Sequence, residues 1–214
     1  MDLTRLTRLP EMASQDRDVL DALLDEALVC HVGLVVEGHP VVIPTAVARE
    51  GDRLLLHGST GSGWMRLVAA GAPVSVAVTA VDGLVVARSA FESSMLYRSA
   101  VLFGVCSVLE GDEKRSALDV LTDSLIPGRV GEVREPTAKE LAATLVLALP
   151  LERWSLKISD DWPEDPPEDI TGPAWAGLVP LQSTYGDPQA APDLRPGIDI
   201  PPSVDRLRGP LARE

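Results

Sequence analysis

The sequence has few aromatic residues and no long apolar run. Phe, Trp and Tyr make up 4% of the 214 residues, so Val, Leu and Ala must fill the core that 45% hydrophobic content allows. No stretch of 18 apolar residues is present, which argues against a membrane-spanning helix. The N-terminal residues contain no apolar segment of the signal-peptide kind. We therefore expect a cytoplasmic protein with no membrane partner.

Basic residues are also scarce. The chain has 19 Lys and Arg against 32 Asp and Glu, a net charge of −13 and an isoelectric point near 4.6. Non-specific nucleic-acid binding requires a basic surface, so we expect no nucleic-acid partner. An acidic surface still permits a phosphate ligand, because such binding depends on local donors.

Cysteine and histidine are too few for a recognisable metal site. Cys30 and Cys106 lie inside apolar, strand-like runs without a CxxC pattern, which indicates buried reduced thiols. The three histidines, His31, His39 and His57, are scattered and match neither metal-ligand spacing nor a catalytic triad. We predict no metal site, and a structural or a functional role stays open for His31 and His57.

The first half of the chain predicts a helix followed by three strands. Ser14 is a suitable N-cap for a helix over residues 15–27 that carries a leucine face. Short β-branched runs then predict strands over residues 29–36, 40–49 and 53–57, linked by glycine turns as a meander. A helical stretch over residues 62–70 is stopped by Gly71 and Pro73.

The second half predicts a hairpin, two further strands and two helices. Strands over 74–80 and 84–91 flank Asp82-Gly83, a favoured hairpin turn. A long strand over 97–110 and a helix over 113–125 follow. Thr137 and Glu140 form a capping box for a short helix. We expect residues 144–158 to form one long final strand with Pro150 at an edge or bulge.

Most strands precede the later helices, and this order determines the predicted fold class. We expect an α+β, mainly β protein built as a six- to seven-stranded antiparallel β-barrel with flanking helices. The domain boundaries are an N-terminal arm (1–13), a barrel (14–159) and an acidic C-terminal extension (160–214).

The extension holds 11 of the 18 prolines. It is either flexible or packed on the barrel or a dimer partner. If it is packed, Trp162, Trp175, Leu178 and Leu181 are the candidate anchors.

The loop from His57 to Ser62, with sequence HGSTGS, is the strongest local signal of a binding site. Ser59, Thr60 and Ser62 supply hydroxyl groups, and Gly58 and Gly61 permit close backbone approach to a ligand. The following helix start and Arg66 add donors for a phosphate. The loop is neither a Walker A motif nor GxGxxG, and an ordinary turn before a helix is the competing interpretation.

A second group of polar residues lies in the strands after Gly83. Arg88 and Arg98 together can clamp an anion, while Tyr97 and Ser99 share one strand face and Arg98 takes the other. Edge charges of a strand are the alternative interpretation.

Six stretches of the chain resemble a known family. They are LVCHVGLVVEGHPVVIPTAVAREGDRLLLHGS, VTAVDGLVVARSAF, SMLYRSAVLFG, EKRSALDVLTDSLIPGR, ATLVLALPLERWSLKI and WAGLVPL, and together they span about residues 28–181. In order and spacing they are similar to the pyridoxamine 5'-phosphate oxidase-like, FMN-binding split β-barrels, and to the nitroimidazole-resistance-type branch in particular.

The resemblance implies a homodimer with an FMN site at the subunit interface. Ile43, Pro44 and Thr45 then lie along the flavin, the loop from His57 to Ser62 holds its phosphate, and Tyr97, Arg98 and Ser99 contribute from nearby.

Several departures from the family pattern are visible, among them Glu92 or Ser93 and Leu96 where relatives often show His and Asn. Relatives often carry a basic residue at the position of Gly63, which is followed here by Trp64. Arg66, three residues later, is the candidate substitute for that basic residue. The C-terminal Arg-x-His pattern of true pyridoxamine 5'-phosphate oxidases is missing, so oxidation of vitamin B6 is not expected.

The resulting functional prediction is an FMN-dependent oxidoreductase acting on a small organic substrate, with the flavin doing the chemistry. Two alternatives remain open. One is a flavin- or haem-binding protein without turnover, and the other is a specialised biosynthetic enzyme with altered cofactor use.

Overall fold

The computed structural model describes residues 2–210 of the chain. Over this range the protein forms six α-helices, two 3-10 helices and twelve β-strands. Met1 of the predicted arm and residues 211–214 of the predicted extension lie outside the described residues.

The strands differ widely in length, and the longest of them build the body of the protein. Their bounds are β1 (Ala13–Ser14), β2 (Val29–Val36), β3 (His39–Glu50), β4 (Arg53–Ser59), β5 (Val74–Val86), β6 (Ser94–Gly104), β7 (Ser107–Val108), β8 (Thr144–Pro150), β9 (Trp154–Ser159), β10 (Gly177–Pro180), β11 (Thr184–Tyr185) and β12 (Gly209–Pro210).

The helices are mostly short connectors between strands. Their bounds are η1 (Pro10–Met12), α1 (Arg17–Glu26), α2 (Gly63–Ala69), α3 (Gly111–Leu125), η2 (Val130–Glu132), α4 (Ala138–Ala143), α5 (Pro167–Ile170) and α6 (Pro202–Asp205).

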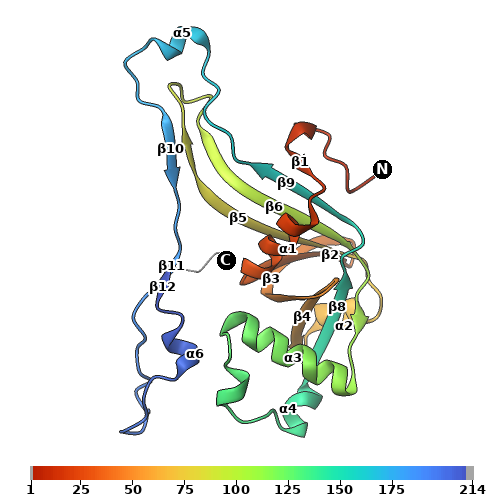
Figure 1. Ribbon diagram of the computed structural model, residues 1–214. Coiled ribbons are helices and arrows are strands. Elements are labelled where there is room, and N and C mark those ends of the chain that lie inside the picture. Colours follow the sequence, from red (N-terminus) through yellow and green to blue (C-terminus); the bar gives the residue numbers. More distant parts are fainter. Residues whose placement is uncertain (1, 211–214) are drawn as a thin grey trace.

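Ten strands form one antiparallel sheet, which Figure 1 shows as the body of the molecule. The strand order is β1-β9-β6-β5-β2-β3-β4-β8-β7, and β10 pairs with β5 off this path. The prediction of six or seven strands is therefore too low. Within residues 2–210 no strand pairing joins β7 to β1, so the sheet path stays open rather than closing into a barrel.

Strand β3 turns the sheet from one half to the other. Its first part pairs with β2, ending at the pair Val29–Ala46, and its last part pairs with β4, beginning at Val47–Leu56. A single strand thus connects the half built on β5, β6 and β9 with the half built on β4 and β8.

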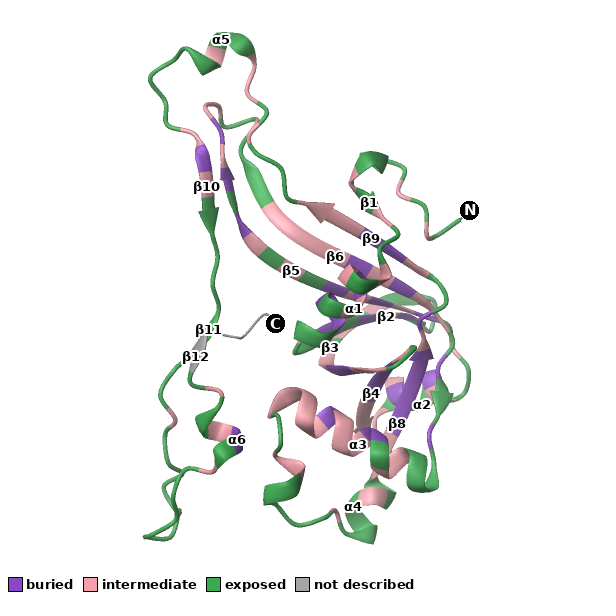
Figure 2. Ribbon diagram, viewed as in Figure 1, coloured by how far each residue is buried: buried purple, intermediate pink, exposed green. Residues whose placement is uncertain are grey.

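Helix α1 covers the inner face of the sheet. Leu20, Leu23 and Leu24 are at most 1% exposed and pack in the main core, which shows as buried segments in Figure 2. The helix is capped by Asp16, whose carboxylate accepts from the amides of the first turn. The predicted cap, Ser14, instead pairs with β9 as part of β1.

Helix α3 covers the opposite face of the second half of the sheet. Ala117 and Leu121 pack on Leu55 of β4 and on Val146 of β8 in a second, smaller cluster. The predicted capping box of α4 is confirmed: Thr137 accepts from the amide of Glu140, whose carboxylate accepts from the amide of Thr137.

The predicted hairpin at Asp82-Gly83 is wrong, because β5 runs straight through it with an irregularity between Val81 and Gly83. Arg98 of β6 holds the Asp82 carboxylate through two hydrogen bonds. A Cβ on Gly83 would stand 2.7 Å from the carbonyl oxygen of Val179 in β10. The glycine therefore permits a neighbouring strand to approach, and does not form a turn.

Two other strand predictions have wrong bounds. The predicted strand over 97–110 begins earlier and ends at Gly104, and β7 follows as a separate piece. The predicted strand over 144–158 is divided into β8, which ends at Pro150 and pairs with β4, and β9, which pairs with β6. Because β4 and β6 lie in different halves of the sheet, the chain must break between its two partners.

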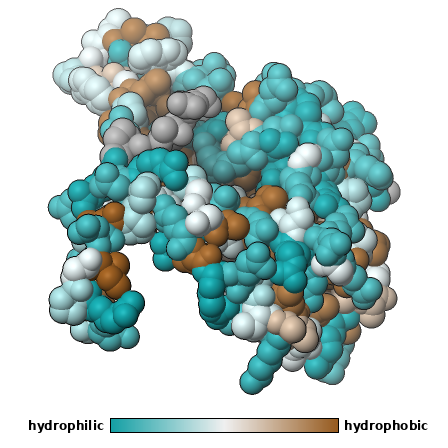
Figure 3. Space-filling model, turned by 60° about the horizontal axis from the view of Figure 1, so that its bottom comes forward, coloured by the Kyte–Doolittle hydropathy of each residue, from teal (hydrophilic) through white to brown (hydrophobic). Residues whose placement is uncertain are grey.

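The C-terminal extension runs along one side of the molecule and contacts the body through β10, through Asp165 and through the segment around α6 (Figures 1 and 3). β10 pairs with β5, Arg88 pairs with the nearly buried carboxylate of Asp165, and Ser203 of α6 hydrogen-bonds to Glu132. Two predicted anchors, Trp162 and Trp175, remain 70% and 65% exposed in the single chain.

The other two predicted anchors of the extension also bury little. Leu181 is 52% exposed, and only Leu178 is half-buried. Backbone pairing and ion pairs therefore hold the extension, not its large apolar side chains.

We expect Leu102→Ala to lower the free energy of unfolding by about 2–5 kcal/mol, because Leu102 is fully buried in the main core. Leu194→Ala is the matched control, since Leu194 is 44% exposed in the extension. Chemical denaturation of both variants measures the difference. Equal losses for the two variants would contradict this placement of the core.

Candidate functional site

The predicted binding loop lies at the end of β4 and leads into α2. His57, Gly58 and Ser59 still belong to β4 and pair with β8, so the loop proper is only Thr60 to Ser62. A Cβ on Gly58 would stand 3.2 Å from Met65 of α2, which means that this glycine allows the helix to pack on the strand. Its role is therefore packing, and the sequence prediction had assigned it to ligand approach.

The backbone amides of the loop are already hydrogen-bonded within the chain. The amide of Thr60 donates to the carbonyl of Ala143, that of Gly61 to Oγ of Ser59, and that of Ser62 to the carbonyl of Ser59. Within the loop itself, the donors that remain for a ligand are the hydroxyl groups of Ser59, Thr60 and Ser62. The first turn of α2, which follows directly, has no side-chain cap at Ser62, so its amides are further donors.

His57 is half-buried at the start of this segment. Its Nδ1 atom is buried and has no hydrogen-bond partner among the described residues, an arrangement that costs about 1–3 kcal/mol unless a partner is supplied. Burial also lowers the pKa of His57 below its ordinary value, so the imidazole is neutral at pH 7. Because side chains alternate along a strand, His57 lies on the side of β4 that carries Leu55, opposite to the side on which Gly58 faces α2. Its unsatisfied, neutral imidazole is open to a polar ligand on that side of the sheet.

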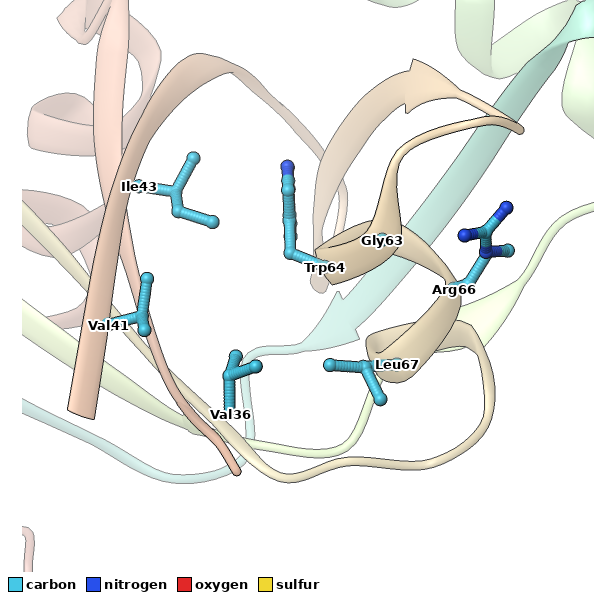
Figure 4. A pocket seen from close by; sticks show the side chains of 7 residues that line it. All are labelled: Val36, Val41, Ile43, Gly63, Trp64, Arg66 and Leu67. Atoms are coloured by element: carbon cyan, nitrogen blue, oxygen red, sulfur yellow. The ribbon is translucent and has the colours of Figure 1, made fainter. Parts of the chain in front are cut away.

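A pocket of about 500 Å³ opens between β3 and α2, directly beside the loop. Figure 4 shows Ile43 and Val41 on one side of it and Trp64 and Leu67 of α2 on the other, with the Arg66 side chain on the far side of the helix. Val36, Gly63 and Arg66 complete the lining. The lining is mainly apolar, which suits a ligand with an apolar body.

Arg66 differs from most arginines of the chain because it has no carboxylate partner within residues 2–210. Arg17, Arg49, Arg53, Arg88, Arg98, Arg115, Arg129, Arg134 and Arg208 all form ion pairs there. In a chain with a net charge of −13, an unpaired arginine at the rim of an apolar pocket is a cation available to an anionic ligand.

The second predicted group lies away from the loop and is already bonded within the chain. The guanidinium of Arg98 pairs with Asp82 and Glu26, which raises its pKa above the ordinary value. Both the amide and the guanidinium of Arg88 bond to Asp165. These contacts leave neither arginine a free anion clamp in the single chain.

Tyr97 and Ser99 lie on the outer side of β6, with Lys157 Nζ 5.6 Å from the centre of the Tyr97 ring. Strands β5 and β2 separate β6 from β3. The two groups of predicted site residues therefore do not meet within one chain.

Pro44 and Thr45 point to opposite sides of β3. Thr45 is half-buried and lies on the same side as Ile43, whereas Pro44 is exposed and pairs with His31 of β2. Only Ile43 of the predicted flavin-contacting residues on β3 lines the pocket.

The side of the sheet that carries Pro44 is uncharged over four neighbouring strands. This uncharged face comprises Val29, His31, Gly33, Val35, Val42, Pro44, Ala46, Ser75, Ala77, Thr79, Ser99 and Val101. It contains no Asp, Glu, Lys or Arg, and its valines at 29, 35 and 42 are 50%, 64% and 66% exposed. Exposed apolar faces of this kind usually mark an interaction surface.

The two thiols are not candidate ligands. Burial raises the pKa of Cys30 to about 12 and that of Cys106 to about 11, so both remain protonated and uncharged at pH 7. Within residues 2–210 no group of three His, Cys, Asp or Glu side chains is arranged to hold a metal ion. In the same part of the chain, no helix is long and apolar enough to cross a membrane.

Sequence reasoning named Gly63 and Trp64 only as departures from a pattern, and it did not predict the pocket. It placed Val36, Val41 and Leu67 only within two predicted strands and a predicted helix. The available signal was Trp64, which stands next to a position where relatives carry a cation. A large aromatic side chain is more often found in the lining of a pocket than in open solvent.

Comparison with solved structures identifies two proteins that align along nearly the whole chain. The FAD and haem binding protein from Mycobacterium smegmatis is 54% identical, with a TM-score of 0.90, covering 93% of this chain and 98% of that one. The flavocytochrome Anf3 from Azotobacter vinelandii is 32% identical, with a TM-score of 0.89 and 97% coverage of both chains.

A third structure shares the fold of part of the chain. It is described as a 5-nitroimidazole antibiotic resistance protein from Bacteroides thetaiotaomicron and is 22% identical, with a TM-score of 0.59, over 68% of this chain and 86% of that one. No curated protein matches this chain significantly.

The family comparison agrees with these structures and confirms the resemblance seen in the sequence. A family model described as pyridoxamine 5'-phosphate oxidase matches residues 16–158, which include the sheet apart from β1 and β10, the loop after β4 and the pocket beside α2. This chain belongs to the pyridoxamine 5'-phosphate oxidase family.

Proposed function

We propose that this protein is a flavin- and haem-binding redox protein of the flavocytochrome type, with FAD as its flavin. The observation that carries the proposal is the 54% identity, over 93% of the chain, to the FAD and haem binding protein. The similarity to a flavocytochrome over 97% of both chains supports it independently. The proposed flavin is therefore FAD and not FMN, which the family resemblance had led us to expect.

The residues around the loop fit a flavin. Three hydroxyl groups remain free to donate to a phosphate, Arg66 supplies an unpaired cation, and the buried Nδ1 of His57 lacks a partner. The flavin, when bound, supplies hydride and single-electron chemistry that no protein side chain provides. The chain itself binds the phosphate, keeps His57 neutral and surrounds the site with apolar side chains.

The donor set also fits a haem. Iron takes neutral imidazole as an axial ligand, and the chain offers three histidines, of which His31 lies exposed in the middle of the uncharged face. Because both thiols are buried in the core, a histidine is the better candidate ligand. We propose that electrons pass between these cofactors and a small-molecule partner.

We further propose that the protein works as a homodimer through the uncharged face. The face is uncharged and exposes several valines, and a second copy that covers it excludes water from the cofactors. In such a dimer the Tyr97, Arg98 and Ser99 segment of one subunit lies closer to the partner's site than it does to its own loop.

The absorption spectrum of the full-length protein tests the cofactor assignment. After incubation with FAD and haemin and removal of excess ligand, we expect flavin bands together with a Soret band. Release by denaturation and chromatography identifies the flavin. A colourless protein that retains neither ligand would refute the proposal.

The double variant Ser59→Ala with Ser62→Ala tests the loop. We expect flavin binding to weaken by about 1–3 kcal/mol, because the loop's hydroxyls are its remaining donors. Titration by quenching of flavin fluorescence measures the dissociation constant. Thr184→Ala, an exposed hydroxyl of the extension, is the control, and an unchanged constant in the double variant would count against the loop.

The variant Val42→Asp tests the dimer, because it places a charge on an otherwise uncharged face. We expect light scattering to show a shift from dimer to monomer with parallel loss of bound flavin. Val133→Asp, at a 45% exposed position away from this face, should leave both unchanged. A Val42→Asp dimer with full flavin content would place the interface elsewhere.

A further inference from the structure

The pocket beside α2 is continuous with the phosphate loop. Ser62 is the last loop residue, and the next residue, Gly63, already lines the pocket. A phosphate held by the hydroxyl groups of the loop therefore lies at the entrance of a 500 Å³ apolar space. Such a volume is within the usual range of small-molecule sites, about 300–1,000 Å³.

Gly63 leaves the passage between loop and pocket open. A Cβ built on this residue would meet no heavy atom within 4 Å, and its backbone does not have the positive φ that requires glycine. Neither packing nor backbone conformation explains the glycine. Its effect is to remove a side chain from the path by which a ligand would continue beyond the loop.

The charge of the passage distinguishes the two flavin nucleotides. FMN ends in a phosphate monoester, which carries a charge of about −1.5 to −2 at pH 7 and needs a nearby cation. In FAD the same phosphate is one half of a pyrophosphate, in which each phosphate bears a single ionised oxygen and the chain continues to adenosine. Gly63 is uncharged and leaves space, and the cation Arg66 follows three residues later. This arrangement suits the pyrophosphate of FAD, which continues to adenosine, better than the terminal phosphate of FMN.

The pocket suits an adenine ring. Trp64 is half-buried and presents its indole into the pocket, opposite Ile43 and Val41 of β3 (Figure 4). Aromatic side chains bind bases by stacking on their faces, and apolar side chains complete the enclosure. Arg66 belongs to the same lining, lies on the outer side of α2 in Figure 4, and has no carboxylate partner within residues 2–210.

We propose that this pocket receives the adenosine monophosphate half of FAD. Trp64 stacks on the adenine, Arg66 binds the pyrophosphate, and Gly63 provides the passage. This proposal rests on one part of the proposed function, which is that a flavin phosphate binds at the loop. It makes Gly63, Trp64 and Arg66 the residues that select FAD over FMN.

The test compares the dissociation constants of FAD and FMN for the full-length protein freed of flavin, by fluorescence titration. We expect the wild type to bind FAD more tightly than FMN. Trp64→Ala should weaken FAD about 10-fold to 100-fold and change FMN less than about threefold, because FMN has no adenine to stack. Trp175→Ala removes an equally large, 65% exposed tryptophan and is the control.

A second variant, Gly63→Lys, keeps the test decisive if Trp64→Ala does not fold. The open space at Gly63 accommodates a lysine, so folding should be preserved. We expect FMN to bind more tightly and FAD more weakly, and the ratio of the two constants to move at least 10-fold toward FMN. ADP should compete with FAD for the wild type and much less for Gly63→Lys.

The outcomes separate this inference from the proposed function. If the wild type binds FAD and FMN equally, or if Gly63→Lys leaves the ratio within about twofold, the pocket assignment is overturned while flavin binding stands. If the wild type binds neither flavin, both are overturned. If ADP fails to compete although FAD is preferred, the preference arises elsewhere and the pocket assignment is again wrong.

Discussion

The divided pairing of β3 determines how the rest of the structure is arranged. Its first residues hydrogen-bond to β2 and its last ones to β4, so one strand belongs to both halves of the sheet. The side of β3 that carries Val41 and Ile43 faces α2. The side that carries Val42 and Pro44 belongs to the uncharged face. Pocket and face are thus the two sides of one strand.

Ion pairing within the chain has a comparable influence on the site. Acidic residues outnumber basic ones, and most arginines in the described chain are held by carboxylates. Arg98 illustrates the effect, since two acidic partners occupy the guanidinium that the sequence suggested for an anion. Where carboxylates are abundant, the informative cations are those without a carboxylate partner, and among these in the described chain Arg66 is the one in the pocket lining.

Local patterns predicted local structure well. Strand β2 follows from its β-branched run between a helix and a glycine turn, and α4 from its capping box, because the interactions that form them lie within a few residues. The leucine face of α1 likewise identified core residues correctly.

Features that depend on distant partners were not predictable in this way. The dipeptide Asp82-Gly83 has the composition of a turn, yet Arg98 and β10 hold it in an extended strand. The break between β8 and β9 depends on which strand each piece pairs with, and no local residue encodes that. The pocket was missed for the same reason, because its lining comes from β2, β3 and α2 together.

The pairing of β10 with β5 protects the sheet from unwanted self-association. Along the edge of β5 opposite β6, β2 covers Ser75 to Ala77 and β10 covers Gly83 to Val86. Unpaired strand edges are templates for chain-to-chain aggregation. Although the extension is rich in proline and has little regular structure, its four-residue strand β10 thus closes a hydrogen-bonding edge that would otherwise recruit other molecules.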